Sequence, residues 1–148
     1  MTRVGVMHVI ESLDAGGAER MAVNLANLTP RERYQTHLCT TKQGGPLEDL
    51  LAPDNGRLRL ECKGGLDNLR ALRSLRAYVR RHDIHILHAH GWSLFAARLA
   101  AFGTQSPTLI WHDHFGRYAL DERPIWLYRL ASRRAGAVIA VNEPLAAW

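Results

Sequence analysis

The fold is decided by the stretch Ser12-Leu-Asp-Ala-Gly-Gly-Ala-Glu-Arg20, which separates a strand pattern from a helix pattern. Before it, Val4-Gly-Val-Met-His-Val-Ile10 is apolar and β-branched, as in a buried parallel strand. After it, apolar residues recur at three- and four-residue spacing and predict an amphipathic helix: Ala18, Met21, Ala22, Leu25, Ala26 and Leu28. Gly16 and Gly17 let a ligand approach the backbone at the helix N-terminus, so this junction predicts an anion site for phosphate.

The glycine turn matches neither of two familiar phosphate-binding motifs. It is not G-x-G-x-x-G, and no G-K-[ST] follows it, so the dinucleotide fingerprint and the P-loop are both excluded. A tight turn that binds nothing is therefore the alternative interpretation. The turn's position at the carboxyl end of a strand favours the phosphate site.

Strands and helices continue to alternate along the rest of the chain. Further strands are predicted at 34–41, 57–61, 84–89, 107–113 and 137–141, and helices at 47–52, 67–82, 94–102 and 125–134. Asp67 is the expected N-cap of the helix predicted at 67–82. This order predicts an α/β, Rossmann-like fold with a mostly parallel sheet of about six strands and helices on both faces.

Composition sets the broad class of the protein. The 148 residues suit one domain, and no apolar run approaches the roughly 20 residues of a membrane helix. Two cysteines, Cys39 and Cys62, imply no disulfide framework, and the N-terminus lacks a signal pattern, so a cytoplasmic location is expected. The net charge of +5 favours anionic partners such as nucleotides, phospholipids or nucleic acid.

Histidines gather where two of the predicted strands end. His88 and His90 are two residues apart, as are His112 and His114, so each pair shares one side of its strand. Two such pairs suggest a metal site with Asp113 as a ligand or orienter, although neither H-x-H-x-D-H nor H-E-x-x-H spacing occurs.

The alternative is that one of these histidines handles a proton or hydrogen-bonds a hydroxylated substrate. We expect His88 to be a satisfied core residue, because it precedes the end of its strand. We expect His90, next to the flexible Gly91, to be functional.

The predicted helix over 69–81 is basic on one side. Arginines share that side and leucines, with one valine, share the other: Arg70, Arg73, Arg76, Arg80 and Arg81 against Leu69, Leu72, Leu75 and Val79. The basic side is either solvated or attached electrostatically to anionic lipid headgroups. Nucleic acid is not an expected partner, because no recognised binding motif accompanies the charge.

Four segments of the chain together resemble a known family. They begin Val9-Ile-Glu-Ser-Leu-Asp-Ala-Gly-Gly-Ala-Glu-Arg-Met-Ala-Val-Asn-Leu25 and continue with Asp83-Ile-His-Ile-Leu-His-Ala-His90, Pro107-Thr-Leu-Ile-Trp-His-Asp-His114 and Ala137-Val-Ile-Ala-Val-Asn142. In content and order they resemble the N-terminal, acceptor-side domain of family 4 glycosyltransferases of the GT-B fold.

The resemblance implies a retaining transferase that moves a sugar from a nucleotide-sugar donor to a glycan or lipid-linked acceptor, without a metal ion or cofactor. It places Gly16 and Gly17 by the donor phosphates and His90, as the catalytic residue, by the reacting sugar. It puts His114 near the acceptor, where we also expect Asp14, Glu19 and His112.

The resemblance also implies a second domain that grips the donor. Residues 1–148 match only the first domain, and Asn142-Glu143-Pro144 begins a helix about one turn before Trp148. We therefore expect a piece of a longer protein, inactive alone. Three alternatives are a metal-dependent hydrolase using the two His-x-His pairs, a noncatalytic phosphate- or nucleotide-binding module, and a basic domain that binds membranes or nucleic acid.

Overall fold

Six parallel strands form one sheet in the computed structural model, which describes residues 2–103, 107–114 and 124–147. In chain order they are β1 (Val4–Ile10), β2 (Tyr34–Thr40), β3 (Gly56–Arg59), β4 (Ile84–His90), β5 (Thr108–Asp113) and β6 (Ala137–Ala140). Their order across the sheet is β3-β2-β1-β4-β5-β6. The chain therefore builds outward from β1 first on one side and then on the other, and β1 and β4 meet at the point of reversal.

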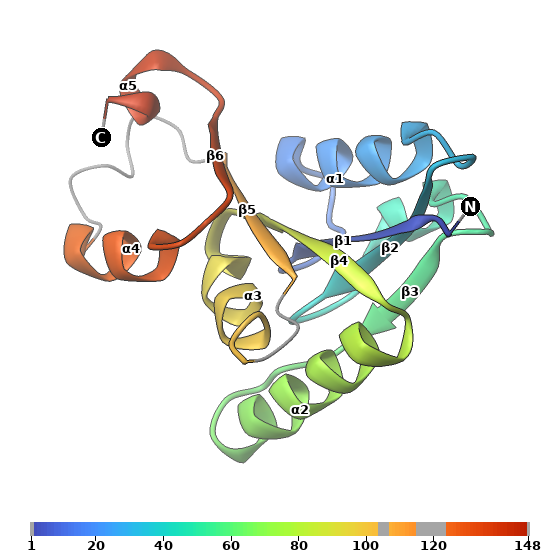
Figure 1. Cartoon of the computed structure of the whole chain (residues 1–148), viewed down its shortest axis with the longest axis horizontal. Coiled ribbons are helices and arrows are strands. Elements are labelled where there is room, and N and C mark those ends of the chain that lie inside the picture. The colour runs from blue at the N-terminus through green and yellow to red at the C-terminus, as the bar shows by residue number, and fades with distance from the viewer. Residues whose placement is uncertain (1, 104–106, 115–123, 148) are drawn as a thin grey trace.

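Helices cover both faces of this sheet. The helices are α1 (Gly17–Leu28), α2 (Leu66–Arg81), α3 (Leu94–Ala100), α4 (Ile125–Ser132) and α5 (Glu143–Ala146), with 3₁₀ turns η1 (Pro46–Leu50) and η2 (Gly91–Ser93). Figure 1 shows α1 on one side of the sheet and α2 and α3 on the opposite side. The predicted fold class is confirmed. Every helix in the described residues is too short or too polar to cross a bilayer.

Side-chain alternation along the strands separates two cores. Met7 and Val9 point to the α2–α3 side, where they pack with Leu75, Leu87 and Leu94. On the α1 side, a second core combines side chains from β1, β2, α1, η1 and the adjoining loops: Ile10, Leu13, Ala22, Val23, Ala26, Leu38, Leu47 and Leu51. Each face of β1 is therefore buried, which fixes the register of this strand at the centre of the sheet.

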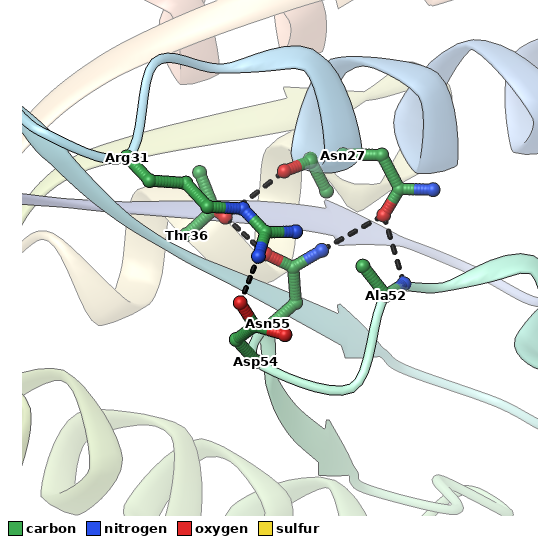
Figure 2. Close-up of polar contacts among 7 residues, drawn as sticks. Asn27, Arg31, Thr36, Ala52, Asp54 and Asn55 are labelled. Carbon is green, nitrogen blue, oxygen red and sulfur yellow. Dashed lines mark hydrogen bonds and ion pairs between the residues drawn. The ribbon is translucent and has the colours of Figure 1, made fainter.

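Polar contacts hold α1 at the end away from the glycine turn. The Asn27 side-chain oxygen accepts hydrogen bonds from the Ala52 amide and from Asn55 Nδ2, both at 2.9 Å, and Asn27 Nδ2 donates to the Leu50 carbonyl at 2.8 Å. Thr36 Oγ1 donates to the Ala26 carbonyl at 3.0 Å, and Arg31 pairs with Asp54 (Figure 2). The loop after η1 and strand β2 therefore fix the C-terminal half of α1.

The start of α2 differs from the sequence prediction. Asp67 is not the N-cap: the helix begins at Leu66, and Asp67 lies in its first turn, 3.4 Å from Arg70 Nη1. Gly64 (φ 107°) and Gly65 (φ 57°) take left-handed backbone conformations that glycine adopts without strain. These two glycines turn the chain into the helix before Asp67 is reached.

Candidate functional site

The glycine turn joins the carboxyl end of β1 to α1. Gly16 is the N-cap of α1 and makes no side-chain cap bond, so the first amides of the helix are available to a ligand. A side chain built on Gly17 would meet no atom within 4 Å, whereas one on Gly16 would meet the carboxylate of Glu19. An anion therefore has an open approach at Gly17, and Glu19 occupies the space beside Gly16.

Asp14 lies exposed before the turn and is held in place by its neighbours. One oxygen of its carboxylate, Oδ2, accepts hydrogen bonds from Ser12 Oγ and from Gln43 Nε2, both at 2.9 Å. The loop after β1 is thereby tied to the loop after β2. Asp14 and Glu19 both stand next to Gly16 and Gly17, as the sequence order requires.

Five histidines form a row on the α1 side of the sheet, across β1, β4 and the end of β5. Strand register pairs His8 with His88 and His90 with His112, and His114 follows on the same side as His112. Neighbouring rings lie close, with centroids 5.0 Å apart for His8 and His88 and 3.9 Å apart for His112 and His114. The predicted pairs therefore come together, and His8 joins them.

Three of these histidines form a hydrogen-bonded chain. His8 Nδ1 lies 3.3 Å from His90 Nε2, and His90 Nδ1 lies 2.8 Å from His114 Nε2. Both ring nitrogens of His90 are therefore engaged, and its side chain is 2% exposed. His114 is half-buried and forms the end of the chain nearer to solvent.

Burial keeps the histidine row uncharged at neutral pH. Desolvation, reinforced by repulsion from neighbouring histidines, lowers the pKa of His8 to about 3 and the pKa of His88 and His114 to about 4. The pKa of His90 lies well below its usual value for the same reasons. A neutral imidazole has one donor and one acceptor nitrogen. The three hydrogen-bonded rings from His8 to His114 can therefore all donate in the same direction.

Not every nitrogen in the row has a partner. Within the described residues, no hydrogen bond reaches His8 Nε2, His88 Nε2 or His112 Nδ1, although all three atoms are buried. His88 is buried as expected, and within the described residues its Nε2 has no hydrogen-bond partner. Three strands bring histidines to one place, which leaves more ring nitrogens there than partners.

The same row has the donor atoms of a transition-metal site. Two triplets have ligand atoms within 4.8 Å of one another: His8 with His88 and His90, and His90 with His112 and His114. Neutral imidazole is a common ligand for zinc, copper and nickel. Asp113 is buried on the opposite side of β5 from His112, so it is not part of either triplet.

Sequence reasoning missed His8. The residue sits in the middle of an apolar strand, where a single histidine is typical of a core position. A signal was present, since His8 shares its side of the strand with Ile10, the last residue of the strand that leads into the glycine turn. Only the pairing of β1 with β4 shows that it meets His88 and His90.

Comparisons with known proteins identify what the chain resembles. A family model described as Glycosyltransferase Family 4 matches residues 15–148. None of the curated proteins matches the chain.

Three solved structures share the fold. MurG of Acinetobacter baumannii superposes with a TM-score of 0.66 at 15% identity, covering 96% of this chain and 42% of MurG. Anabaena HepE, in complex with UDP and glucose, gives a TM-score of 0.63 at 20% identity and covers 90% of this chain and 37% of HepE. A Listeria monocytogenes protein assigned provisionally as a UDP-N-acetylglucosamine 2-epimerase gives 0.65 at 20% identity, covering 95% of this chain and 40% of that one.

These likenesses show the fold, which is the Rossmann-like half of GT-B. The chain spans less than half the length of each of the three proteins.

Proposed function

The chain belongs to glycosyltransferase family 4, and on that premise we propose that it supplies the acceptor-side domain of a retaining glycosyltransferase. The reaction moves a sugar from a nucleotide-sugar donor to an acceptor hydroxyl. The observation that carries the proposal is the chain of neutral histidines that lines β1, β4 and β5 beside the glycine turn. These groups lie at the strand reversal, where ligands of such sheets bind.

Charge separates as the sugar–phosphate bond breaks. Negative charge grows on the departing diphosphate and positive charge on the anomeric carbon. The open backbone at Gly17 and the N-terminus of α1 offer partial positive charge to the diphosphate. A neutral imidazole near the sugar orients hydroxyl groups without repelling the positive anomeric carbon.

Within the histidine chain, we assign His90 to the reacting sugar and His114 to the acceptor. His114 is the half-buried end, so a ligand reaches it first. For His90 to bond a sugar hydroxyl directly, its hydrogen bond to His114 must be exchanged for one to the ligand. His8 then holds Nε2 of His90 and fixes the ring. Asp14, Glu19 and His112 complete the acceptor side of this proposal.

The proposal also divides labour between domains. The stretch from Ser12 to Arg20, which contains the glycine turn, carries two carboxylates, Asp14 and Glu19, and one cation, Arg20. This excess of negative charge does not favour the binding of a diphosphate. Most of the cations that bind the diphosphate are therefore expected in a nucleotide-binding domain beyond these residues. We therefore propose that residues 1–148 alone bind the donor weakly and do not turn over.

The test is a transfer assay with the intact protein and panels of UDP- and GDP-sugars. His90→Ala is expected to lower turnover about a hundredfold. Because the ring is buried and bonded to His8 and His114, the variant also loses stability, so turnover is compared at a temperature where its melting curve shows that it is folded. His85→Ala is the matched control on β4, because His85 lies at the opposite end of the strand, where its Nδ1 accepts a hydrogen bond from the Gly5 amide. Unchanged turnover in the His90 variant would remove this residue from the site.

The two histidine triplets favour a second candidate, a metal-dependent hydrolase. It is separated from the transferase by elemental analysis of protein purified without chelators. The hydrolase requires stoichiometric zinc or a similar ion and loses activity on chelation. The proposed transferase keeps its activity in chelator.

We further propose that the protein works at the cytoplasmic face of an anionic membrane, with α2 as the contact. Arg76 is not available for this role, because it donates two hydrogen bonds to the Leu99 carbonyl, at 2.7 and 3.2 Å. The remaining exposed arginines of the helix are Arg70, Arg73, Arg80 and Arg81. Binding to anionic vesicles that falls steeply with rising salt, together with no binding to duplex DNA, would support this contact.

A further inference from the structure

A pocket of about 730 Å³ opens between α2 and α3 at the carboxyl edge of the sheet. It lies on the side of the sheet opposite to the histidine row and is separate from the glycine turn and the histidines of the proposed reaction site. Its inner walls are apolar and come largely from the two helices: Leu69, Leu72, Leu75, Phe95 and Leu99. A space of this size suits a small organic ligand.

The pocket adjoins the proposed reaction site through the turn after β4. Trp92 and Ser93 line the pocket and follow His90 by two and three residues. Gly91 makes this turn with φ 55°, and its carbonyl accepts a hydrogen bond from Trp111 Nε1 at 3.2 Å. The turn after β4 therefore connects one wall of the pocket directly to His90.

Polar groups line the pocket where it meets the sheet. Ser93 is 2% exposed, and within the described residues no hydrogen bond reaches its hydroxyl. A buried hydroxyl without a partner is costly, and a polar group of a ligand would satisfy it.

Positive charge stands at the same end. The chain has only two lysines, Lys42 and Lys63, and both line this pocket. Lys42 Nζ lies 2.5 Å from Glu11, whereas no ion pair to Lys63 is found in the described residues. Lys63 also precedes the glycines that lead into α2, whose N-terminus adds partial positive charge.

We propose that this pocket binds an amphiphile with a single aliphatic chain and a phosphate head. The chain lies between α2 and α3, and the phosphate lies at the sheet edge beside Lys63 and Ser93. Under the proposed function, on which this identification rests, the amphiphile is the lipid part of the acceptor. Its glycan end then points past Trp92 towards the histidine row. Charge complementarity selects this occupant, because an apolar protein segment would leave Lys63 and the Ser93 hydroxyl unmatched.

The test measures binding of alkyl phosphates to the 148-residue chain by titration calorimetry below their micelle concentrations. Affinity is expected to rise about fourfold for each added methylene that is buried, or about 250-fold from hexyl to decyl phosphate. Decanol is expected to bind more weakly than decyl phosphate, and inorganic phosphate is expected not to bind measurably. An affinity that does not depend on chain length would overturn the proposal.

Two pairs of variants locate the binding. Ala96 lines the pocket on α3, so Ala96→Phe fills it and is expected to lower decyl phosphate affinity at least tenfold. Ala77→Phe, at an exposed position of α2 outside the pocket, is the control for bulk. Lys63→Gln is expected to reduce affinity for decyl phosphate and leave affinity for decanol unchanged. Arg3→Gln, at an exposed position before β1 and outside the pocket, is the control for charge. Equal effects within either pair would place binding elsewhere.

The outcome is separable from that of the proposed function. Decyl phosphate binding with these variant effects, but no transfer by the intact protein, would retain the pocket and reject the transferase. Transfer without such binding would retain the transferase and reject the lipid. Self-association or capture of another protein segment that Ala96→Phe abolishes, with no alkyl phosphate bound, would also reject it.

Discussion

At the residue scale, His90 is hydrogen-bonded to another histidine on each side of its ring. Its two ring nitrogens meet His8 and His114, and all three rings lie in a part of the sheet that excludes charge. Such a ring cannot act as a strong base while it is enclosed, since protonation would place a charge in a desolvated site. Its chemistry is therefore that of a neutral hydrogen-bonding group, which suits the orientation of a sugar.

The same burial predicts an acid-sensitive fold. In the folded chain the pKa of His88 lies at about 4, and in the unfolded chain at about 6.5. Above pH 6.5 both states are neutral, and the full stability is present. As the pH falls from 6.5 towards 4, only the unfolded chain takes up protons. The free energy of unfolding then decreases with a slope that approaches about 1.4 kcal/mol per pH unit for each such histidine.

His88→Leu tests this expectation, because it removes one titrating ring and one unpartnered nitrogen. The slope of the unfolding free energy between pH 7 and 5, measured by urea denaturation, should fall by about the contribution of one proton. Ile110 is the β5 partner of His88 and does not titrate, so Ile110→Val should lower stability without changing the slope. A His88→Leu slope equal to that of the parent would mean that this ring takes up a proton over the same pH range in the folded and the unfolded chain.

At the element scale, a glycine lets two loops pack closely beside the proposed site. Gly45 precedes η1 and packs against the backbone of Leu13 and Asp14, so that a Cβ there would collide with main-chain atoms. The Leu13 amide donates to the Gly44 carbonyl at 3.4 Å, and the Leu47 amide donates to the Leu13 carbonyl at 3.1 Å. The loop after β2 therefore contacts the segment between β1 and the glycine turn and holds it in place.

Gly45→Ala should therefore destabilise the chain by about 1–3 kcal/mol, because the backbone of Leu13 cannot yield as a flexible side chain would. The matched control is Gly17→Ala, where the space is open. At that position alanine should leave stability unchanged or raise it by about 0.4–1 kcal/mol through the unfolded state. Chemical denaturation of both variants compares them, and an equal loss in the two would show that steric contact at Gly45 is not the cause.

At the scale of the whole molecule, the sheet is unequally covered. The central strands β1 and β4 are buried on both sides, but β6 at one end of the sheet exposes apolar side chains, with Val138 at 55% and Ile139 at 40%. Trp126 and Leu130 of the nearby α4 are exposed as well. An open, apolar edge strand is a template for association with another chain.

We therefore expect residues 1–148, on their own, to self-associate through β6. Val138→Lys should keep the protein monomeric at concentrations where the parent forms larger species, because an edge lysine opposes strand pairing. Sedimentation velocity over a concentration series makes the comparison, with Leu28→Lys on the distant α1 as the control for added charge. Association that survives Val138→Lys but not Leu28→Lys would place the contact on α1 instead.

The amino-acid sequence by itself determined the fold class and the order of the elements. Apolar periodicity reports whether a segment is buried on one face or two, and this is a local property, so Val4–Ile10 and the basic helix of residues 66–81 were predicted nearly to their ends. It also indicated His90, His112 and His114, because residues at strand ends meet at one edge of a parallel sheet.

Only the tertiary structure decided which histidines touch. Strand order places β4 beside β1 and so brings His8 to His90 across 82 positions of sequence, and no local pattern encodes that pairing. The pocket between α2 and α3 is likewise invisible in the sequence, since it depends on how far apart two helices pack on one sheet face. Contacts between distant segments follow from the packing of the whole core, which a run of neighbouring residues does not specify.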